Sequence, residues 1–115
     1  MVDDDPEVSD VLAQWLAADG HQPVAATDGA AALDLIRRER FDLILTDIRM
    51  PRLDGPSLYR ELKRQDPELA RHLIFMTGDT LSPDVAQMLA ASGLPSVAKP
   101  FDPEEVLRVV RRELR

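Results

Sequence analysis

Short apolar runs alternate along this chain with longer segments in which apolar residues recur at helical spacing. The clearest runs are residues 43–45, inside a predicted strand at 41–46, and residues 73–76. Their length and their lack of polar residues are typical of strands that are buried on both faces of a parallel sheet. Because parallel strands must be joined by long crossover connections, the alternation predicts an α/β fold in which helices cover both faces of the sheet.

Helix starts are marked by one short pattern that recurs along the chain. A capping side chain precedes a proline and an acidic residue at Asp5-Pro6-Glu7, Ser82-Pro83-Asp84 and Asp102-Pro103-Glu104. Proline suits the first helical position, and the acid interacts favourably with the positive end of the helix dipole. Together with the apolar periodicity, these signals predict helices after Asp5, over 29–38 and 55–65, after Ser82 and after Asp102, and strands over 23–27, 41–46, 73–76 and 96–98.

The composition indicates one domain and excludes several classes of function. A length of 115 residues suits a single core, so we predict one domain over residues 1–115. The formal net charge of −7 argues against direct binding of nucleic acid or of a membrane surface. The absence of cysteine excludes disulfides and thiolate chemistry. The sequence has no apolar stretch of membrane-spanning length and no signal-peptide pattern, so we expect a cytoplasmic location.

Side chains with useful chemistry follow the predicted strands. In chain order they are Asp3 with Asp4, then Asp47, Thr77 and Lys99. In open parallel sheets, ligands bind beyond the carboxyl ends of the strands, so these side chains should meet at one edge. Converging carboxylates repel one another and favour a hard divalent cation such as Mg²⁺. Because lysine and threonine can bind phosphate oxygens, the set is suited to phosphoryl transfer onto an aspartate.

Four motifs, in unbroken order, resemble those of the receiver domains of two-component response regulators. They are Val2-Asp3-Asp4-Asp5-Pro6, the phosphoacceptor-like segment Thr46-Asp47-Ile48-Arg49-Met50-Pro51-Arg52-Leu53-Asp54-Gly55, Phe75-Met76-Thr77-Gly78, and Val97-Ala98-Lys99-Pro100-Phe101. The resemblance covers essentially the whole chain. It implies a doubly wound, flavodoxin-like sheet of five parallel strands in the order 2-1-3-4-5, as in chemotaxis regulators.

The resemblance implies a phosphorelay function. Asp47 would accept a phosphoryl group from a histidine kinase or a histidine phosphotransfer protein, and Thr77 and Lys99 would contact its oxygens. The peptide bond between Lys99 and Pro100 is expected to be cis. The protein would then assist its own phosphorylation and dephosphorylation rather than act as an enzyme, and would change its binding of a downstream protein or of a domain in the same chain. The resemblance also allows a homodimer.

The resemblance further implies Mg²⁺ as the cofactor. Asp4 would bind the ion directly and Asp3 through water, while Asp47 and the backbone carbonyl of Arg49 would be further ligands. Arg49 and Asp79 flank the expected site and could pair, which would affect the lifetime of the phosphoryl group.

The sequence departs from the family pattern at one position of the last strand. Ser96 is found where receivers usually carry Tyr or Phe, a ring that reports phosphorylation by turning inward behind the threonine. The segments 77–82 and 93–96 resemble most closely the receivers of hybrid sensor kinases.

Two other functions use similar residues. A phosphatase of the haloacid-dehalogenase kind also needs an aspartate nucleophile, Mg²⁺, a threonine and a lysine, but its second aspartate would stand at the position of Arg49. A degenerate receiver that acts only as a protein-interaction module is the other alternative, and Ser96 is the residue that favours it.

The first strand of the family fold is expected to be truncated. Only Met1 and Val2 precede Asp3, whereas a central strand usually has about five residues. We therefore expect either a marginal fold or one completed by residues upstream of Met1, with a short strand over residues 1–3 as the alternative.

Overall fold

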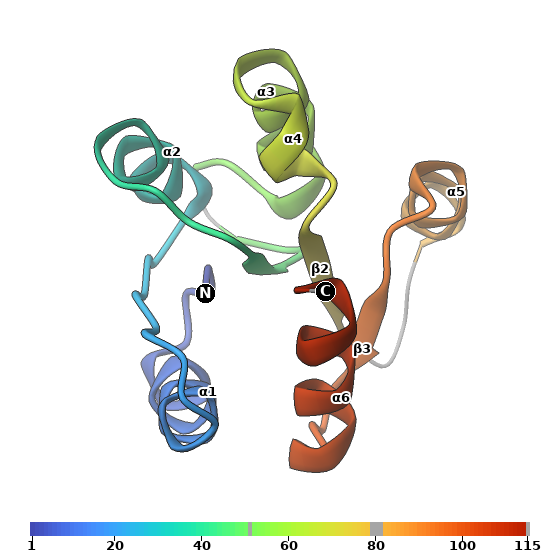
Figure 1. Ribbon diagram of the computed structural model, residues 1–115. Helices are drawn as coiled ribbons and strands as arrows, with labels where there is room; N and C mark the ends of the chain where they lie inside the picture. Colours follow the sequence, from blue (N-terminus) through green and yellow to red (C-terminus); the bar gives the residue numbers. More distant parts are fainter. Residues whose placement is uncertain (51, 79–81, 115) are drawn as a thin grey trace.

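A computed structural model describes residues 1–50, 52–78 and 82–114 of the chain. Its centre is a parallel sheet of three strands in the order β1-β2-β3 (Figure 1). The strands are β1 (Ile44–Asp47), β2 (Leu73–Thr77) and β3 (Ser96–Ala98). Thr46 pairs with Phe75, and Met76 pairs with Val97. The prediction of an α/β fold with a parallel sheet is therefore confirmed.

The two other predicted strands are present only as isolated bridges. Val2 forms parallel bridges to Ala26 on one side and to Thr46 on the other. Its amide donates to the carbonyl of Leu45 at 2.7 Å, and its own carbonyl accepts from the amide of Asp47 at 2.8 Å. The predicted strand at 23–27 is wrong in extent, since Ala26 alone has a bridge there among the described residues. The physical reason is that residues 1–3 offer a very short partner for it.

Six helices are formed by the described residues: α1 (Pro6–Ala18), α2 (Gly29–Arg38), α3 (Gly55–Gln65), α4 (Pro67–Ala70), α5 (Pro83–Ser92) and α6 (Pro103–Glu113). The predicted capping residues cap their helices: the side chain of Asp5 accepts from the amide of Glu7, Ser82 from Val85, and Asp102 from Glu104. The short helix α4 was not predicted, although Asp66-Pro67-Glu68 repeats the same start pattern and Asp66 caps it through the amide of Leu69.

The core is divided by the sheet into two apolar clusters. Side chains of β2 alternate between them, because successive residues of a strand point to opposite faces: Leu73 and Phe75 join the first cluster, and Ile74 and Met76 join the second. The first cluster packs under α2, α3 and α5, and the second under α1 and α6. Figure 1 shows these two groups of helices on opposite sides of the sheet. The predicted cover of both faces is therefore confirmed.

Among the described residues, no helix is both long enough and apolar enough to cross a membrane.

Candidate functional site

The predicted site residues meet at the carboxyl edge of the sheet. Asp3 directly follows the bridging residue Val2, Asp47 is the last residue of β1, and Thr77 is the last residue of β2. Lys99 follows the last residue of β3, and its amide donates to the carbonyl of Thr77 at 2.8 Å. The topology of the sheet therefore brings together residues that are almost one hundred positions apart in the sequence.

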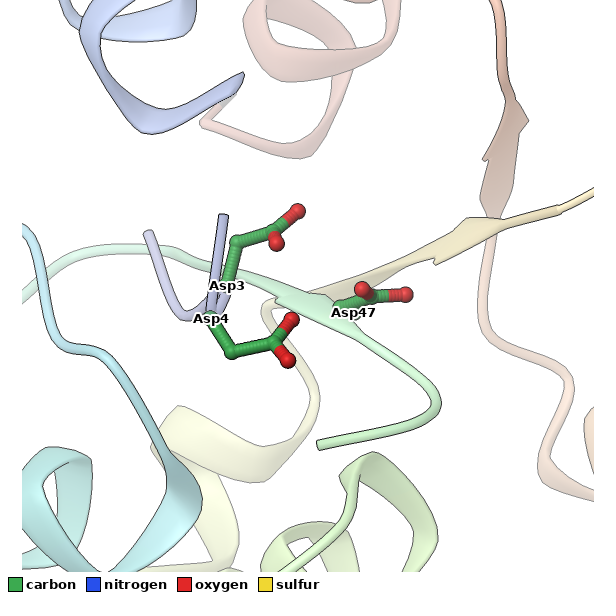
Figure 2. A group of neighbouring side chains, drawn as sticks. All are labelled: Asp3, Asp4 and Asp47. Carbon is green, nitrogen blue, oxygen red and sulfur yellow. The ribbon is translucent and has the colours of Figure 1, made fainter. Parts of the chain in front are cut away.

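Three carboxylates of this edge form a compact acidic cluster, which we call the acidic site: Asp3, Asp4 and Asp47. One oxygen of each lies within 4.8 Å of the others. Figure 2 shows Asp3 and Asp4 on the N-terminal segment, beside the end of the strand that carries Asp47. Asp3 is buried, Asp47 is half-buried and Asp4 is exposed, so Asp4 is the carboxylate most open to an ion arriving from solvent.

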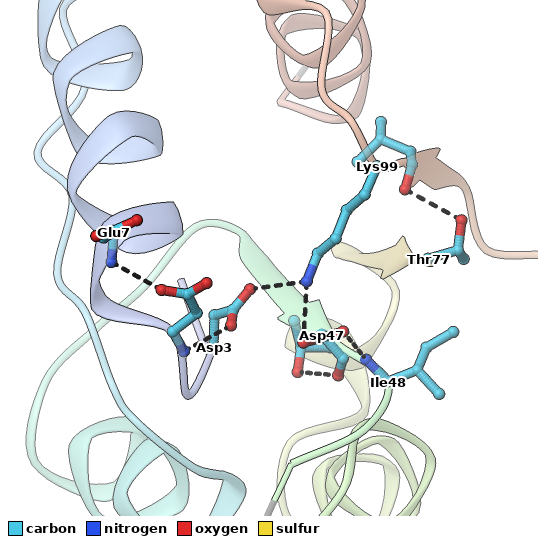
Figure 3. A network of polar contacts seen from close by, with 9 residues as sticks. Asp3, Glu7, Asp47, Ile48, Thr77 and Lys99 are labelled. Carbon is cyan, nitrogen blue, oxygen red and sulfur yellow. Dashed lines mark hydrogen bonds and ion pairs between the residues drawn. The ribbon is translucent and has the colours of Figure 1, made fainter. Parts of the chain in front are cut away.

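Lys99 forms ion pairs with two residues of the acidic site (Figure 3). Its Nζ lies 3.1 Å from Oδ2 of Asp47 and 3.3 Å from Oδ2 of Asp3. The peptide bond from Lys99 to Pro100 is cis, as the sequence predicted. With three carboxylates and one ammonium group, the ionised site carries a formal charge of −2. That charge matches the charge of one divalent cation.

The surroundings of Asp3 and Lys99 shift the pKa values of both groups upward. Burial raises the pKa of Asp3; the amide of Asp5 opposes this effect, the charge of Asp47 adds to it, and Lys99 opposes it. Burial lowers the pKa of Lys99, but the hydrogen bond and charges of Asp47 and Asp3 outweigh burial and hold the pKa above its ordinary value. Because native Asp3 binds its proton more tightly than the unfolded chain does, its contribution to stability is present at low pH and is lost as the pH rises through its native pKa.

Asp47 is held by its own backbone neighbours. The amide of Ile48 donates to Oδ1 of Asp47 at 2.8 Å, while Oδ2 accepts from Lys99. After Asp47 the chain leaves the sheet through residues 48–50 and 52–54, which we call the β1–α3 loop, and it returns at Gly55. A Cβ atom at Gly55 would lie only 2.4 Å from the carbonyl oxygen of Asp47. The return of the loop therefore requires glycine.

Thr77 does not contact the acidic site through its hydroxyl group. The Oγ1 atom donates to the carbonyl of Val97 on the neighbouring strand at 3.3 Å (Figure 3). The side chain is largely buried, with an exposed fraction of 7%. Because a hydroxyl has one proton to donate, this hydrogen bond must break before Thr77 can donate to a group bound to Asp47.

Two further predictions concern residues around the site. Arg49 is exposed on the β1–α3 loop, whereas its expected partner Asp79 and the motif residue Pro51 lie outside the described residues. Ser96 is exposed at the start of β3. Its side chain is therefore not buried behind Thr77.

One polar contact near the site was missed at the sequence level. Arg52 donates from Nε to Oδ2 of Asp28 at 2.9 Å, and a second guanidinium nitrogen pairs with the same carboxylate. Asp28 also caps α2 by accepting from the amide of Ala31 at 2.8 Å. The Asp28-Gly29 pair before a helix was the available signal for the cap, but no local pattern pointed to Arg52.

The α/β fold, with an acidic site and a lysine at the carboxyl edge of its sheet, is typical of phosphoacceptor domains. Comparison with known proteins identifies the same class. The family model described as Response regulator receiver domain matches residues 1–111. The chain therefore belongs to this family. A receiver domain is a phosphoacceptor rather than a classical enzyme, and response regulators act with histidine kinases in two-component signalling.

Individual relatives support the family. Response regulator MprA of Mycobacterium leprae (strain TN) is 36% identical over 114 residues, which cover 99% of this chain and 49% of that protein. A solved CheY-like receiver domain protein from Methanospirillum hungatei JF-1 has a TM-score of 0.89 and 27% identity, over 98% of this chain and 89% of that one. The receiver domain of a signal transduction histidine kinase from Syntrophus aciditrophicus has a TM-score of 0.87 and 29% identity, over 98% and 86% of the two chains.

The matched relatives differ in length and in the kind of protein that carries the receiver domain. The chain spans about half the length of Response regulator MprA, the curated relative described above. The relatives include receivers of a response regulator and of a histidine kinase, so attachment to a hybrid sensor kinase stays a prediction.

Proposed function

We propose that this domain accepts a phosphoryl group on Asp47 from the phosphohistidine of a histidine kinase or of a histidine phosphotransfer protein. The observation that carries the proposal is the position of Lys99, whose Nζ lies within 3.3 Å of both Asp47 and Asp3 at the carboxyl edge of the sheet. In the transfer, an oxygen of Asp47 forms a bond to phosphorus while the bond from phosphorus to the donor imidazole nitrogen breaks. The other ring nitrogen of the phosphohistidine carries a proton, so neutral imidazole is the leaving group.

Lys99 and Thr77 would bind the transferred group. The ammonium group of Lys99 already lies 3.1 Å from Oδ2 of Asp47, so it can form an ion pair with a phosphoryl oxygen after a small movement. The hydroxyl of Thr77 would leave the carbonyl of Val97, which is a neutral acceptor at 3.3 Å, for a charged phosphoryl oxygen. Because hydrogen bonds to charged acceptors are stronger than those between neutral groups, phosphorylation favours this exchange.

Receiver domains bind Mg²⁺, and the acidic site of this chain fits such an ion. Its ligands are carboxylate oxygens, which Mg²⁺ prefers. Together with Lys99, the three carboxylates have a formal charge of −2, which one Mg²⁺ ion neutralises. We propose Asp4 and Asp47 as direct ligands, and Asp3, which is the most buried of the three carboxylates, as a ligand through water. The carbonyl of Arg49 would be a further ligand. When bound, the ion neutralises charge on the transferred phosphoryl group.

The central test is phosphorylation by a small donor. With acetyl phosphate and Mg²⁺, we expect the intact mass of the protein to increase by one phosphoryl group, and Asp47→Asn to abolish the increase because the nucleophilic oxygen is lost. Asp34→Asn is the matched control, since Asp34 is an exposed carboxylate on α2. Normal labelling of the Asp47→Asn protein would refute the assignment.

Two further measurements, of the hydrolysis of a phosphate ester and of partner binding, separate the alternatives. Continuous turnover of a phosphate ester would favour a phosphatase, although Arg49 occupies the place of the second aspartate that such enzymes need. A protein that accepts phosphate from no donor, yet binds partners, would be a degenerate receiver.

Mg²⁺ should stabilise the native state. Ion binding relieves the repulsion between carboxylates only in the folded chain, so each tenfold excess over the dissociation constant is expected to add about 1.4 kcal/mol to the free energy of unfolding. Thermal melting with and without Mg²⁺ measures this effect. Asp4→Asn should remove most of it and Asp34→Asn should not. A melting temperature that ignores millimolar Mg²⁺ would count against the acidic site as a metal site.

A further inference from the structure

The β1–α3 loop is tied to the start of α2 by an ion pair. The guanidinium group of Arg52 pairs through two nitrogens with Oδ2 of Asp28. Asp28 is 2% exposed, whereas 74% of the Arg52 side chain is exposed. The other carboxylate oxygen of Asp28 caps α2 through the amide of Ala31. Asp28 therefore belongs to a rigid part of the fold, and Arg52 reaches it from the loop.

Backbone contacts join the same two segments. The amide of Gly29 donates to the carbonyl of Leu53 at 3.1 Å, and a Cβ atom at Gly29 would lie 2.4 Å from that carbonyl oxygen. At the end of the loop, the amide of Gly55 donates to the carbonyl of Ile48 at 2.9 Å. The loop is thus fixed at both of its ends, and Arg52 adds a contact between them.

The backbone of Arg52 shows that this contact has a cost. Its φ angle is +67°, in the left-handed region that side chains other than glycine rarely adopt. Among the described residues it is the sole non-glycine residue with a positive φ. Glycine or asparagine would adopt this conformation more easily, so a role of the side chain best explains arginine at this position.

We propose that Arg52, through its ion pair with Asp28, is a positioning residue that holds the β1–α3 loop in the conformation that binds Mg²⁺. The inference rests on the proposed function, in which the carbonyl of Arg49 on this loop is a ligand of the ion. Arg49 lies two residues after Asp47 and three before Arg52, so a shift of the loop moves that carbonyl relative to the acidic site. Arg52 itself contacts neither the ion nor the phosphoryl group.

Arg52→Gly separates this role from a general role in folding. Glycine relieves the strained backbone, and this gain offsets the loss of the ion pair, so the melting temperature without Mg²⁺ should change little. The dissociation constant for Mg²⁺, measured by calorimetric titration, should increase about tenfold, as is usual when an outer support of a metal ligand is lost. Arg52→Lys keeps the charge but not the paired donors, and should give an intermediate constant. Arg52→Asn should repeat the result of Arg52→Gly.

The control removes an equal charge from a different ion pair. Arg64 pairs with Glu61 on the exposed face of α3, so Arg64→Ala should leave the Mg²⁺ constant unchanged. If Arg52→Gly and Arg52→Asn bind Mg²⁺ as the wild type does, or if both melt at lower temperature without the ion, the positioning role is refuted while the proposed function stands. A wild-type protein that binds no Mg²⁺ refutes both proposals.

Discussion

Five apolar residues placed ahead of Met1 should raise the free energy of unfolding by about 2 kcal/mol. At the amino end of Val2, a groove of about 460 Å³ is lined by Met1, by residues 20–24 and 39–43, and by the apolar side chains of Leu16, Leu45 and Val110. An added strand would bury about three or four apolar side chains there, at about 1.5–3 kcal/mol each, and the cost of ordering its five backbone residues, at about 1–2 kcal/mol each, offsets most of that gain.

Thermal unfolding of the two proteins in parallel tests this expectation. The melting temperature should rise by about 10 °C with the apolar extension. An extension of five alternating Gly and Ser residues is the control for length, and it should leave the melting temperature unchanged because it buries no apolar surface. Equal and cooperative melting of the apolar and the polar extensions would show that the groove gains nothing from being filled.

Replacing Gly55 by alanine should destabilise the domain by about 3 kcal/mol, the upper part of the usual range for overpacking. The new Cβ atom would lie 2.4 Å from the carbonyl oxygen of Asp47 and 3.1 Å from Cα of Ile48, and both are backbone atoms that cannot simply rotate away. Relief of the clash must therefore move Asp47, so we also expect slower labelling by acetyl phosphate.

The sign of the effect makes the Gly55 test sharp. Gly55 is the first residue of α3, and alanine in a helix is otherwise more favourable than glycine by about 0.5–1 kcal/mol. A stabilised Gly55→Ala protein would therefore contradict the close approach. Gly78→Ala is the matched control because a Cβ atom there would meet nothing within 4 Å and the backbone does not need glycine, so chemical denaturation should show a change within about 0.5 kcal/mol.

Most of the fold could be predicted from local patterns. The helices at Gly29–Arg38 and Gly55–Gln65 have the predicted bounds, because capping residues and apolar periodicity act over a few neighbouring positions. The strand at 23–27 was wrong in extent because a strand also needs a partner, and within the described part of the chain Val2 alone forms a bridge to Ala26. The start pattern at Asp66 was overlooked although it equals the three that were recognised.

The candidate site was predictable where it depends on topology. Since the carboxyl ends of parallel strands share one edge, the order of the strands was enough to bring Asp3, Asp47 and Lys99 together. The ion pair of Arg52 with Asp28 was not predictable in this way, because neither the positive φ of Arg52 nor the path of the loop past α2 has a local sequence signal. The bonding of Thr77 to Val97 likewise depends on a side-chain rotation that the sequence does not encode.

The packing on the two sides of Thr77 differs in a way that bears on signalling. The preceding residues of β2, from Leu73 to Met76, are completely buried, whereas none of the ten residues of α5 is buried. Regions with few buried apolar contacts open locally at a lower free energy than a packed core strand. The change of acceptor that we propose for the Thr77 hydroxyl would therefore start from a completely buried strand. We expect α5 to be the neighbouring element that responds to it at the lowest free energy.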